Sequence, residues 1–591
     1  INEFSKSLSK YKKELKEKNN FYYEENLFII EEELAILLVH KELSNILSQF
    51  IVYGAEKLKE YNIRTVDPKL RLSLTHNLGF FDGMVSLEID GQVISLFDAI
   101  NFYKKNSYIK LNDGTTAIIN KSYIEKLERI LKKSKNNVRF SFFDIPIIED
   151  LVDEATYQEN FKQYKEMFLG FNNLNESKLE IPYINAKLRN YQEKGYKWLK
   201  YLYENNLGGC LADDMGLGKT IQTITLLSSI YPGEEKPSLI VMPKSLLYNW
   251  ENEIEKFNPG LSYYIYYAQA KDLRKAMTKN IILTTYSILR NEIEKFKNED
   301  FHYIILDESQ NIKNIQSQIS KAVVLLKAKH RLALSGTPIE NNLSELYALF
   351  RFLNPMMFSS FDDFYDHYMN PIQKDNNIEV TNELRKKIYP FILRRLKKDV
   401  LEDLPPKIEQ TLYVEMTDEQ CKLYEQRRAF YYKNLKTQIA VEGINKAQFI
   451  ILQALNELRQ IASVPEVKTD GTVISAKREL LLEYVNEVIS LGHKILIFTN
   501  YLGSVEYISE DLEKAGISHL IMTGATQKRQ ELVDEFQNNE KNKVFLMTLK
   551  TGGLGLNLTK ADYVFIYDPW WNKSVENQAI DRTHRIGQDK T

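Results

Sequence analysis

The sequence contains 591 residues, of which 43% are hydrophobic and 27% are charged, and its formal net charge is −2. These proportions are typical of a soluble globular protein, and the length corresponds to about three or four domains, each able to bury its own core. Because the net charge is close to zero, any surface that binds nucleic acid must be a local basic patch.

Membrane and metal-binding signals are weak in this sequence. The longest apolar stretch, residues 34–39, is cut by His40-Lys41-Glu42, far short of a membrane span, and no signal-peptide pattern opens the chain. The first residue is Ile1 rather than Met, so we expect a fragment of a longer protein. Cys210 and Cys421 are far apart, without CxxC or HExxH, so we expect no zinc and a reducing, cytoplasmic environment.

The first 180 residues predict an α+β accessory domain. Residues 5–18 and 27–58 have helical periodicity, whereas residues 70–74 and 84–90 alternate with period two, as strands do. Another helix is predicted over residues 125–133. Asp82, Glu88 and Asp90 are acidic residues of the kind a nuclease uses, but the cluster lacks a lysine at the expected place, so solvated carboxylates are the preferred interpretation.

A phosphate-binding loop is predicted at DDMGLGKT, residues 213–220. A short apolar strand precedes it and a helix follows, so backbone N–H groups of the loop, with Gly216 and Gly218, can surround a phosphate at the helix N-terminus. Lys219 is expected to reach the β- and γ-phosphates, and the Thr220 hydroxyl is expected to hold Mg²⁺. The usual pattern has glycine at position 213, where this chain has Asp213.

Buried strands, separated by helices, follow the loop at residues 238–243, 281–287, 303–306 and 331–338. They predict a doubly wound parallel sheet whose ligand site lies at the strand carboxyl ends. Asp307 and Glu308 follow one of these strands: Asp307 suits Mg²⁺, and Glu308 suits polarisation of an attacking water. Upstream of the loop, Gln192 has an amide that can pair with an adenine edge.

Six motifs occur in one order over about two-thirds of the chain. They are DDMGLGKT (213–220), SGTPIEN (335–341), FILRRLKKDV (391–400), LPPK (404–407), TGGLGLNL (551–558) and QAIDRTHRIGQ (578–588). Together they resemble the SWI/SNF-type (Snf-two) DNA-translocase ATPases of the superfamily-two helicases. Gln310, where eukaryotic members usually have histidine, resembles the bacterial branch, as do residues 70–133 more weakly.

The resemblance implies two RecA-like lobes with helical insertions, at residues 181–400 and 401–591, after an accessory domain at residues 1–180. It implies a site for ATP and Mg²⁺ between the lobes. The family roles carry over to Asp214 and Gln578 at the nucleotide, to Arg582 and Arg585 as arginine fingers, and to double-stranded DNA contacts by Lys244, Trp250, Thr285, Ser287, Arg394, Arg395, Thr548 and Lys550. The basic cluster around Lys397 is, by pattern alone, a solvated helix face; the resemblance makes it a linker that contacts DNA or the accessory domain.

The expected function is an ATP-dependent motor that moves on duplex DNA through sequence-independent phosphate contacts and remodels protein–DNA complexes in the bacterial cytoplasm, at the nucleoid. Two alternatives stay open: a strand-separating helicase, and a nucleotide-gated scaffold for a protein partner such as RNA polymerase. The bracing segment that the family has beyond this region is expected after Thr591.

Overall fold

The computed structural model describes residues 2–14, 20–24, 27–49, 52–53, 58, 63–66, 68–77, 80–89, 91–134, 137–151, 159–174, 179–231, 233–336, 342–401, 407–442, 444–552, 556, 558–571, 573–584 and 588. The contacts divide the chain into two compact units. The first unit consists of Ile1–Lys178 and Phe350–Ile392, and the second consists of Leu179–Leu349 and Leu393–Thr591. Residues 350–392, which the sequence analysis assigned to the first lobe, therefore cluster with the N-terminal residues.

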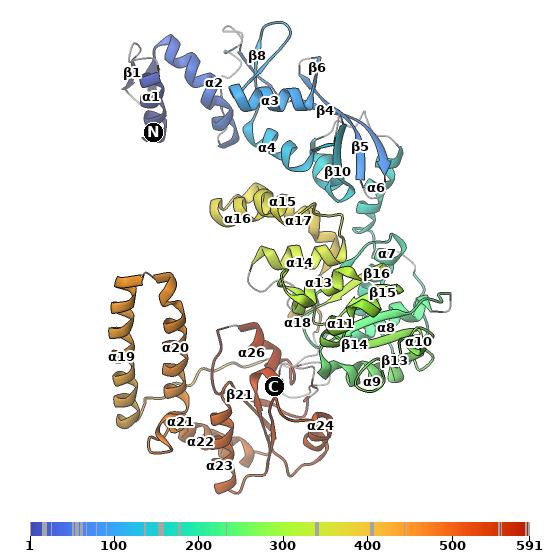
Figure 1. The fold of residues 1–591 in the computed structure, drawn as a ribbon, viewed down its shortest axis with the longest axis vertical. Helices are drawn as coiled ribbons and strands as arrows, with labels where there is room; N and C mark the ends of the chain where they lie inside the picture. Colours follow the sequence, from blue (N-terminus) through green and yellow to red (C-terminus); the bar gives the residue numbers. More distant parts are fainter. Residues whose placement is uncertain are drawn as a thin grey trace. The chain divides into compact units, whose positions relative to one another are not determined.

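The first unit contains a five-stranded antiparallel sheet with β5 at its centre, paired with β4, β6 and β10, while β9 pairs with β10 (Figure 1). Its strands are β4 (Lys69–Asn77), β5 (Phe80–Ile89), β6 (Gln92–Ser95), β9 (Lys132–Ser134) and β10 (Asn137–Ser141). In β5 the alternating residues Phe81, Val85, Leu87 and Ile89 are buried in the core. The period-two prediction for this region is confirmed.

Smaller elements complete the first unit. The remaining strands are β1 (Phe21–Glu24), β2 (Leu27–Ile30), β3 (Ile63–Thr65), β7 (Ile109–Lys110) and β8 (Thr116–Ile118). The helices are α1 (Asn2–Glu14), α2 (Glu32–Gln49), α3 (Leu96–Asn106), α4 (Lys121–Ile130), α5 (Ile145–Ile148), α6 (Glu159–Gly170), α15 (Phe361–Phe364), α16 (Asn370–Asp375) and α17 (Ile378–Ile388), and α14 (Leu343–Leu353) crosses the boundary between the units. The predicted helix over residues 27–58 is wrong at its start, because the β-branched and aromatic run of β2 pairs with β1.

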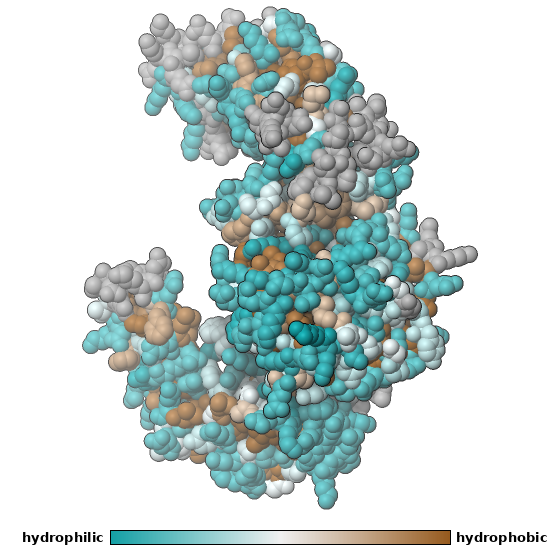
Figure 2. Space-filling model, turned by 45° about the vertical axis from the view of Figure 1, so that its right-hand side comes forward, coloured by the Kyte–Doolittle hydropathy of each residue, from teal (hydrophilic) through white to brown (hydrophobic). Residues whose placement is uncertain are grey.

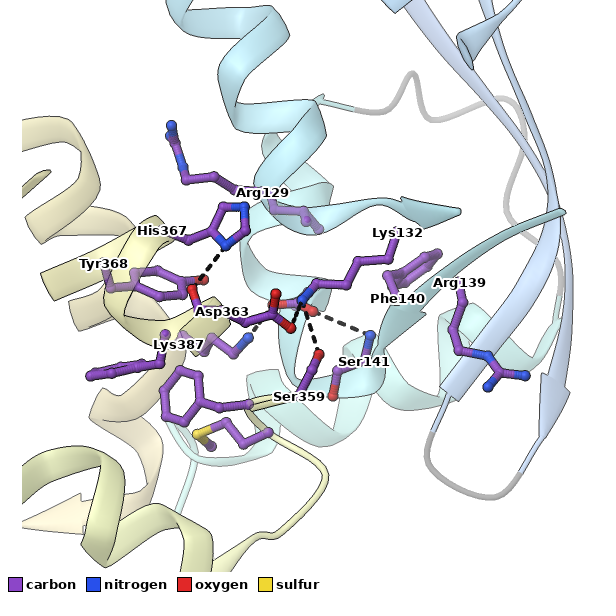
Figure 3. A pocket seen from close by; sticks show the side chains of 15 residues that line it. Arg129, Lys132, Arg139, Phe140, Ser141, Ser359, Asp363, His367, Tyr368 and Lys387 are labelled. Carbon is purple, nitrogen blue, oxygen red and sulfur yellow. Dashed lines mark hydrogen bonds and ion pairs between the residues drawn. The ribbon is translucent and has the colours of Figure 1, made fainter. Parts of the chain in front are cut away.

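Within the first unit, α17 is held against the N-terminal residues by buried ion pairs. Arg129 of α4 and Glu383 of α17 are 2.8 Å apart, with side chains 10% and 5% exposed, and Lys387 pairs with Asp144 in a similarly buried setting. Beside them lies a cavity of about 70 Å³, where Lys132 reaches across to Asp363 (Figure 3). Charged groups on both sides therefore join the inserted helices to the N-terminal part.

Arg129→Met is expected to loosen this junction, because it leaves the Glu383 carboxylate buried without its partner. Loss of one member of a buried pair typically costs ~3–5 kcal/mol. In hydrogen-exchange measurements on the whole chain, amides of α17 should therefore lose protection. Lys132→Met is the matched control, since the Lys132–Asp363 pair is 37% and 39% exposed and is worth about 1 kcal/mol or less. Equal protection in both variants would contradict the assignment.

The first lobe of the second unit is a seven-stranded sheet in the order β13-β14-β12-β15-β16-β11-β17. Its strands are β11 (Gly209–Leu211), β12 (Ser238–Met242), β13 (Tyr263–Ile265), β14 (Ile281–Thr285), β15 (Asp300–Leu306), β16 (Lys327–Leu334) and β17 (Ile392–Leu393). The pairs between β11 and β16, β16 and β15, β15 and β12, β12 and β14, and β14 and β13 are all parallel. All residues of β12 and β14 are buried, which explains their mainly apolar sequences.

Helices surround this sheet, as expected of a doubly wound fold (Figure 1). They are α7 (Asn190–Glu204), α8 (Lys219–Ile230), α9 (Leu247–Phe257), α10 (Leu273–Ala276), α11 (Tyr286–Asn291), α12 (Ile293–Phe296), α13 (Gln318–Leu325) and α18 (Lys397–Val400). After α17 the chain passes through Pro390 and enters β17 (Ile392–Leu393).

The second lobe has a four-stranded parallel sheet in the order β19-β20-β18-β21. Its strands are β18 (Ile495–Thr499), β19 (His519–Met522), β20 (Val544–Thr548) and β21 (Tyr563–Ile566). Its helices are α19 (Asp418–Glu442), α20 (Ile444–Ser463), α21 (Glu466–Thr469), α22 (Ala476–Ser490), α23 (Leu502–Lys514), α24 (Arg529–Asn538), α25 (Leu549–Gly552) and α26 (Lys573–Ile580). The fold class predicted from the sequence, two RecA-like α/β lobes with helical insertions, is confirmed.

The surface in Figure 2 is mostly hydrophilic, with apolar residues in separate patches. The helix pair α19–α20 carries exposed apolar side chains, among them Phe449 and Leu452, which are 77% and 63% exposed. Among the described residues, no helix is both long enough and apolar enough to cross a membrane.

Candidate functional site

The phosphate loop connects the end of β11 to the start of α8. Gly216 and Gly218 have φ angles of +84° and +81°, a left-handed conformation that glycine adopts without strain. A Cβ atom on Gly218 would also lie 2.6 Å from the Gln192 amide nitrogen. The loop therefore brings its backbone to the N-terminus of a twelve-residue helix, an arrangement that binds phosphate.

Lys219 is the first residue of α8, and its ammonium group lies over the loop. Its Nζ donates to the carbonyl oxygens of Asp213 at 2.7 Å and Asp214 at 3.5 Å. Thr220, the next residue, is half-buried at the same helix end. Both predicted phosphate and Mg²⁺ ligands thus lie at the mouth of the loop.

Asp213 explains why the loop departs from the usual glycine. Its carboxylate is fully buried and accepts from Arg395 Nε at 2.8 Å and from Gln222 Nε2 at 3.1 Å, while a second Arg395 nitrogen also contacts it. Arg395 follows β17, so this ion pair attaches the segment after β17 to the phosphate loop. The Arg395 guanidinium is engaged by Asp213, Gln222 and the Tyr191 carbonyl, and a DNA contact by Arg395 stays a prediction.

The acidic pair lies at the carboxyl end of β15, which is separated from β11 in the sheet by one strand, β16. The Asp307 side chain accepts a hydrogen bond from Trp250 Nε1 at 2.8 Å and another from the Glu308 backbone N–H at 2.8 Å. Burial, followed by the negative charge of Glu308, raises the pKa of Asp307 to about 7. A carboxylate that is buried beside a second acid fits a divalent cation, which would favour its ionised form, so the residues present suit Mg²⁺.

Glu308 has a φ angle of +50°, an uncommon left-handed conformation for a residue with a side chain. Its Oε2 accepts a hydrogen bond from Gln310 Nε2 at 2.8 Å, and Gln310 Oε1 in turn accepts from Ser335 Oγ at 3.2 Å. Ser335 follows β16, so this chain of hydrogen bonds orients Glu308 from the neighbouring strand. Gln310 therefore has a structural role that the sequence analysis did not foresee.

The second lobe contributes Arg582, whose side chain is only 4% exposed. Its NH2 group lies 3.8 Å from the sulfur of Met215, a residue of the phosphate loop. The structure therefore brings one predicted arginine finger to the loop. Arg585 lies outside the described residues, and Gln578 is half-buried on α26.

Gln192 lies beneath the loop, with both ends of its amide engaged. Its Oε1 accepts from the Arg189 backbone N–H at 2.9 Å, and its Nε2 donates to the Leu217 carbonyl at 3.1 Å. These bonds brace the loop from α7. Adenine recognition by Gln192 stays a prediction.

The predicted DNA contacts fall into two groups. Lys244, Ser287, Arg394 and Lys550 are exposed, and Thr548 is half-buried beside Thr551. Trp250 and Thr285 are buried: Trp250 is fully buried on Asp307, and Thr285 is 4% exposed, with its hydroxyl capping α11 by accepting from the Ile288 N–H at 3.3 Å. DNA contacts by these two residues stay predictions.

Trp250→Phe is expected to lower kcat for ATP hydrolysis by ~10–100-fold, the usual effect of removing a group that orients a metal ligand. Phenylalanine keeps most of the apolar packing but cannot donate to Asp307. The Mg²⁺ concentration for half-maximal activity should rise. Trp198→Phe, at a residue 5% exposed in the same lobe, is the control. Equal Mg²⁺ dependence in the two variants would show that the indole N–H does not matter.

Two family models and several known proteins match the sequence of this chain. One family model, "SNF2-related domain", matches residues 191–467, and another, "Helicase conserved C-terminal domain", matches residues 476–587. A protein of Mycoplasma pneumoniae described as an uncharacterized ATP-dependent helicase is 36% identical over 81% of this chain and 45% of its own length. The ISWI chromatin-remodeling complex ATPase ISW2 of Saccharomyces cerevisiae is 36% identical over 69% of this chain and 38% of its own length.

A solved structure, the SWI2/SNF2 ATPase core of Sulfolobus solfataricus in complex with dsDNA, is 38% identical over 70% of this chain and 88% of that chain, with a TM-score of 0.40. The chain spans less than half the length of each of the two curated relatives.

Proposed function

Since the chain belongs to the SNF2 family of helicase-like ATPases, we propose that it hydrolyses ATP and uses the energy to move along double-stranded DNA and remodel protein–DNA complexes. The observation that carries the proposal is the approach of Arg582, from the second lobe, to Met215 of the phosphate loop in the first. Hydrolysis at such a site can respond to relative movement of the two lobes.

Each residue has a role that its surroundings support. The loop N–H groups and Lys219 bind the phosphates, and Thr220 and Asp307 hold Mg²⁺. Mg²⁺, when bound, offsets negative charge on the phosphates. Glu308, oriented by Gln310, accepts a proton from the attacking water at its carboxylate, and Arg582 stabilises the charge that develops on the γ-phosphate.

DNA binding is proposed at the exposed residues Lys244, Ser287, Arg394 and Lys550. Thr548, two residues before Lys550, is proposed to contribute as well. Ammonium, guanidinium and hydroxyl groups contact phosphates without reading bases, so duplexes of any sequence should bind. The overall charge of −2 means that the attraction is confined to such residues. A bacterial, cytoplasmic location at the nucleoid is part of this proposal.

The decisive experiment measures phosphate release by the purified chain with and without duplex DNA. Stimulation by duplexes of unrelated sequence is expected, with an apparent affinity that falls steeply as salt is raised and counterions compete. A triplex-forming third strand should be displaced when ATP is present, whereas a tailed duplex should stay intact.

Each other outcome has a definite meaning. Efficient unwinding of the tailed duplex would identify a strand-separating helicase. ATP binding without any response to DNA would favour a scaffold for a protein partner. An unchanged rate of ATP hydrolysis in a variant of the phosphate loop such as Lys219→Ala would refute the site itself.

A further inference from the structure

The segment that follows β17 runs along the phosphate loop and is attached to it at several points. The Asp214 backbone N–H donates to the Arg395 carbonyl at 3.0 Å, and the Lys397 backbone N–H donates to Asp214 Oδ2 at 3.0 Å. The ion pair between Arg395 and Asp213 adds a third attachment. Residues 213–214 are therefore bonded directly to the segment that contains Lys397.

Lys397 is buried, with only 7% of its surface exposed, which is rare for lysine unless its ammonium group has partners. Those partners belong to the second lobe. Its Nζ lies 2.6 Å from Asp581 Oδ1 and also donates to the His584 carbonyl. Asp581 and His584 flank Arg582 in the turn that follows α26.

Backbone hydrogen bonds also hold the turn from within, because the N–H groups of Asp581, Arg582 and Thr583 donate to the carbonyls of Asn577, Ala579 and Ile580. The Arg582 carbonyl accepts from the Leu558 N–H at 3.1 Å, and the His584 N–H donates to the Ile580 carbonyl at 3.2 Å. Lys397 is thus a point at which this turn is bonded to the phosphate-loop segment. One residue contacts the phosphate loop through its backbone and the arginine turn through its side chain.

We propose that Lys397 is a positioning residue for ATP hydrolysis, which sets the location of Arg582 relative to the phosphate loop. The inference rests on the proposed ATPase function. Lys397 itself touches no phosphate: it acts through Asp581 and His584, so its loss misplaces the guanidinium without removing it. Since a finger acts mainly on charge in the transition state, the effect should fall on kcat.

Lys397→Met is expected to lower kcat by ~10–100-fold, as for other residues that orient a catalytic group, while the KM for ATP changes little. Lys397→Arg, which retains the positive charge, should recover part of the rate. In an Arg582→Ala background, Lys397→Met should cause no further loss, because the group that Lys397 positions is already gone. A further tenfold loss in that background would overturn the proposal.

Lys494→Met is the matched control for a purely structural effect. Lys494 is also a buried lysine of the second unit, and its Nζ donates to the carbonyls of Phe536 at 2.6 Å and Asn539 at 3.0 Å, away from both loops. This variant should lose stability yet keep its kcat per folded molecule. A similar fall in kcat for both variants would mean that Lys397 acts only through stability.

Hydrogen exchange separates this inference from the proposed function. Lys397→Met should increase exchange at residues 582–584 while leaving the amides of α8 protected. If the unmodified chain hydrolysed no ATP while Lys397→Met still increased exchange at residues 582–584, the function would be wrong and the connection between the loops would stand. Unchanged exchange at residues 582–584 would refute the connection.

Discussion

Glu308→Gln is expected to lower kcat for ATP hydrolysis by ~10²–10⁴-fold, the range for loss of a general base, while ATP binding is retained. Glutamine has nearly the same shape and can still pair with Gln310, but it cannot accept the proton of the attacking water. Lys219, Thr220 and Asp307 are unchanged in this variant, so nucleotide affinity should persist. Single-turnover hydrolysis together with binding of a fluorescent ATP analogue measures the two effects separately.

Asp300→Asn is the control for Glu308→Gln, because Asp300 begins the same strand, β15, at the opposite edge of the sheet, where it is exposed beside Lys236. Its hydrolysis rate should match that of the unmodified chain. Lys219→Ala should abolish turnover as well, and should also weaken nucleotide binding. Near-normal hydrolysis by Glu308→Gln or Lys219→Ala would refute the assignment of the site.

Arg582→Ala is expected to lower kcat by ~10³-fold or more, with a much smaller change in ATP affinity. Arg582→Lys should restore little activity, since a compact ammonium lacks the planar fork with which guanidinium meets phosphate oxygens. Arg585→Ala is expected to behave similarly on the basis of the sequence motif. The rate at saturating ATP and the affinity for the analogue are the two quantities to compare.

Arg529→Ala provides the control for the arginine finger. Arg529 lies in the same lobe and donates to the carbonyls of Thr526 and Gly524, and it contacts no residue of the phosphate loop in the described hydrogen bonds. Its removal should leave kcat unchanged. Loss of ATP affinity alone in Arg582→Ala, at constant kcat, would contradict the finger role.

The architecture of the second unit was accessible from the sequence because its physical signals are local. Short, mainly apolar runs such as those of β12 and β14 predict parallel strands covered on both faces, and the phosphate loop identifies the strand that precedes α8. The N-terminal sheet was likewise indicated by period-two alternation. The secondary structure of residues 27–30 could not be predicted from the sequence alone, since this run fits both a helix and a strand until its partner, β1, is known.

The site residues show where sequence reasoning ends. The family resemblance assigned Trp250 to DNA, and only the fold places its indole on Asp307, 57 positions along the chain. Thr285 likewise ends a strand but caps the next helix. Such roles depend on contacts between distant segments, which periodicity does not encode. One signal was present: an acid in place of a loop glycine required a buried cation.

The buried Asp213 also constrains which substitutions related sequences can carry. Asp213 and Arg395 are 182 positions apart and are joined inside the protein with Gln222, so a neutral residue at either position leaves a buried charge uncompensated. Substitution of Gly195 depends on the same side chains, because a Cβ there would lie 1.8 Å from the Gln222 oxygen and 2.8 Å from an Arg395 nitrogen. Correlated substitution is the expected signature: sequences that lose Asp213 should lose Arg395 as well, and only in those sequences should a larger residue appear at position 195.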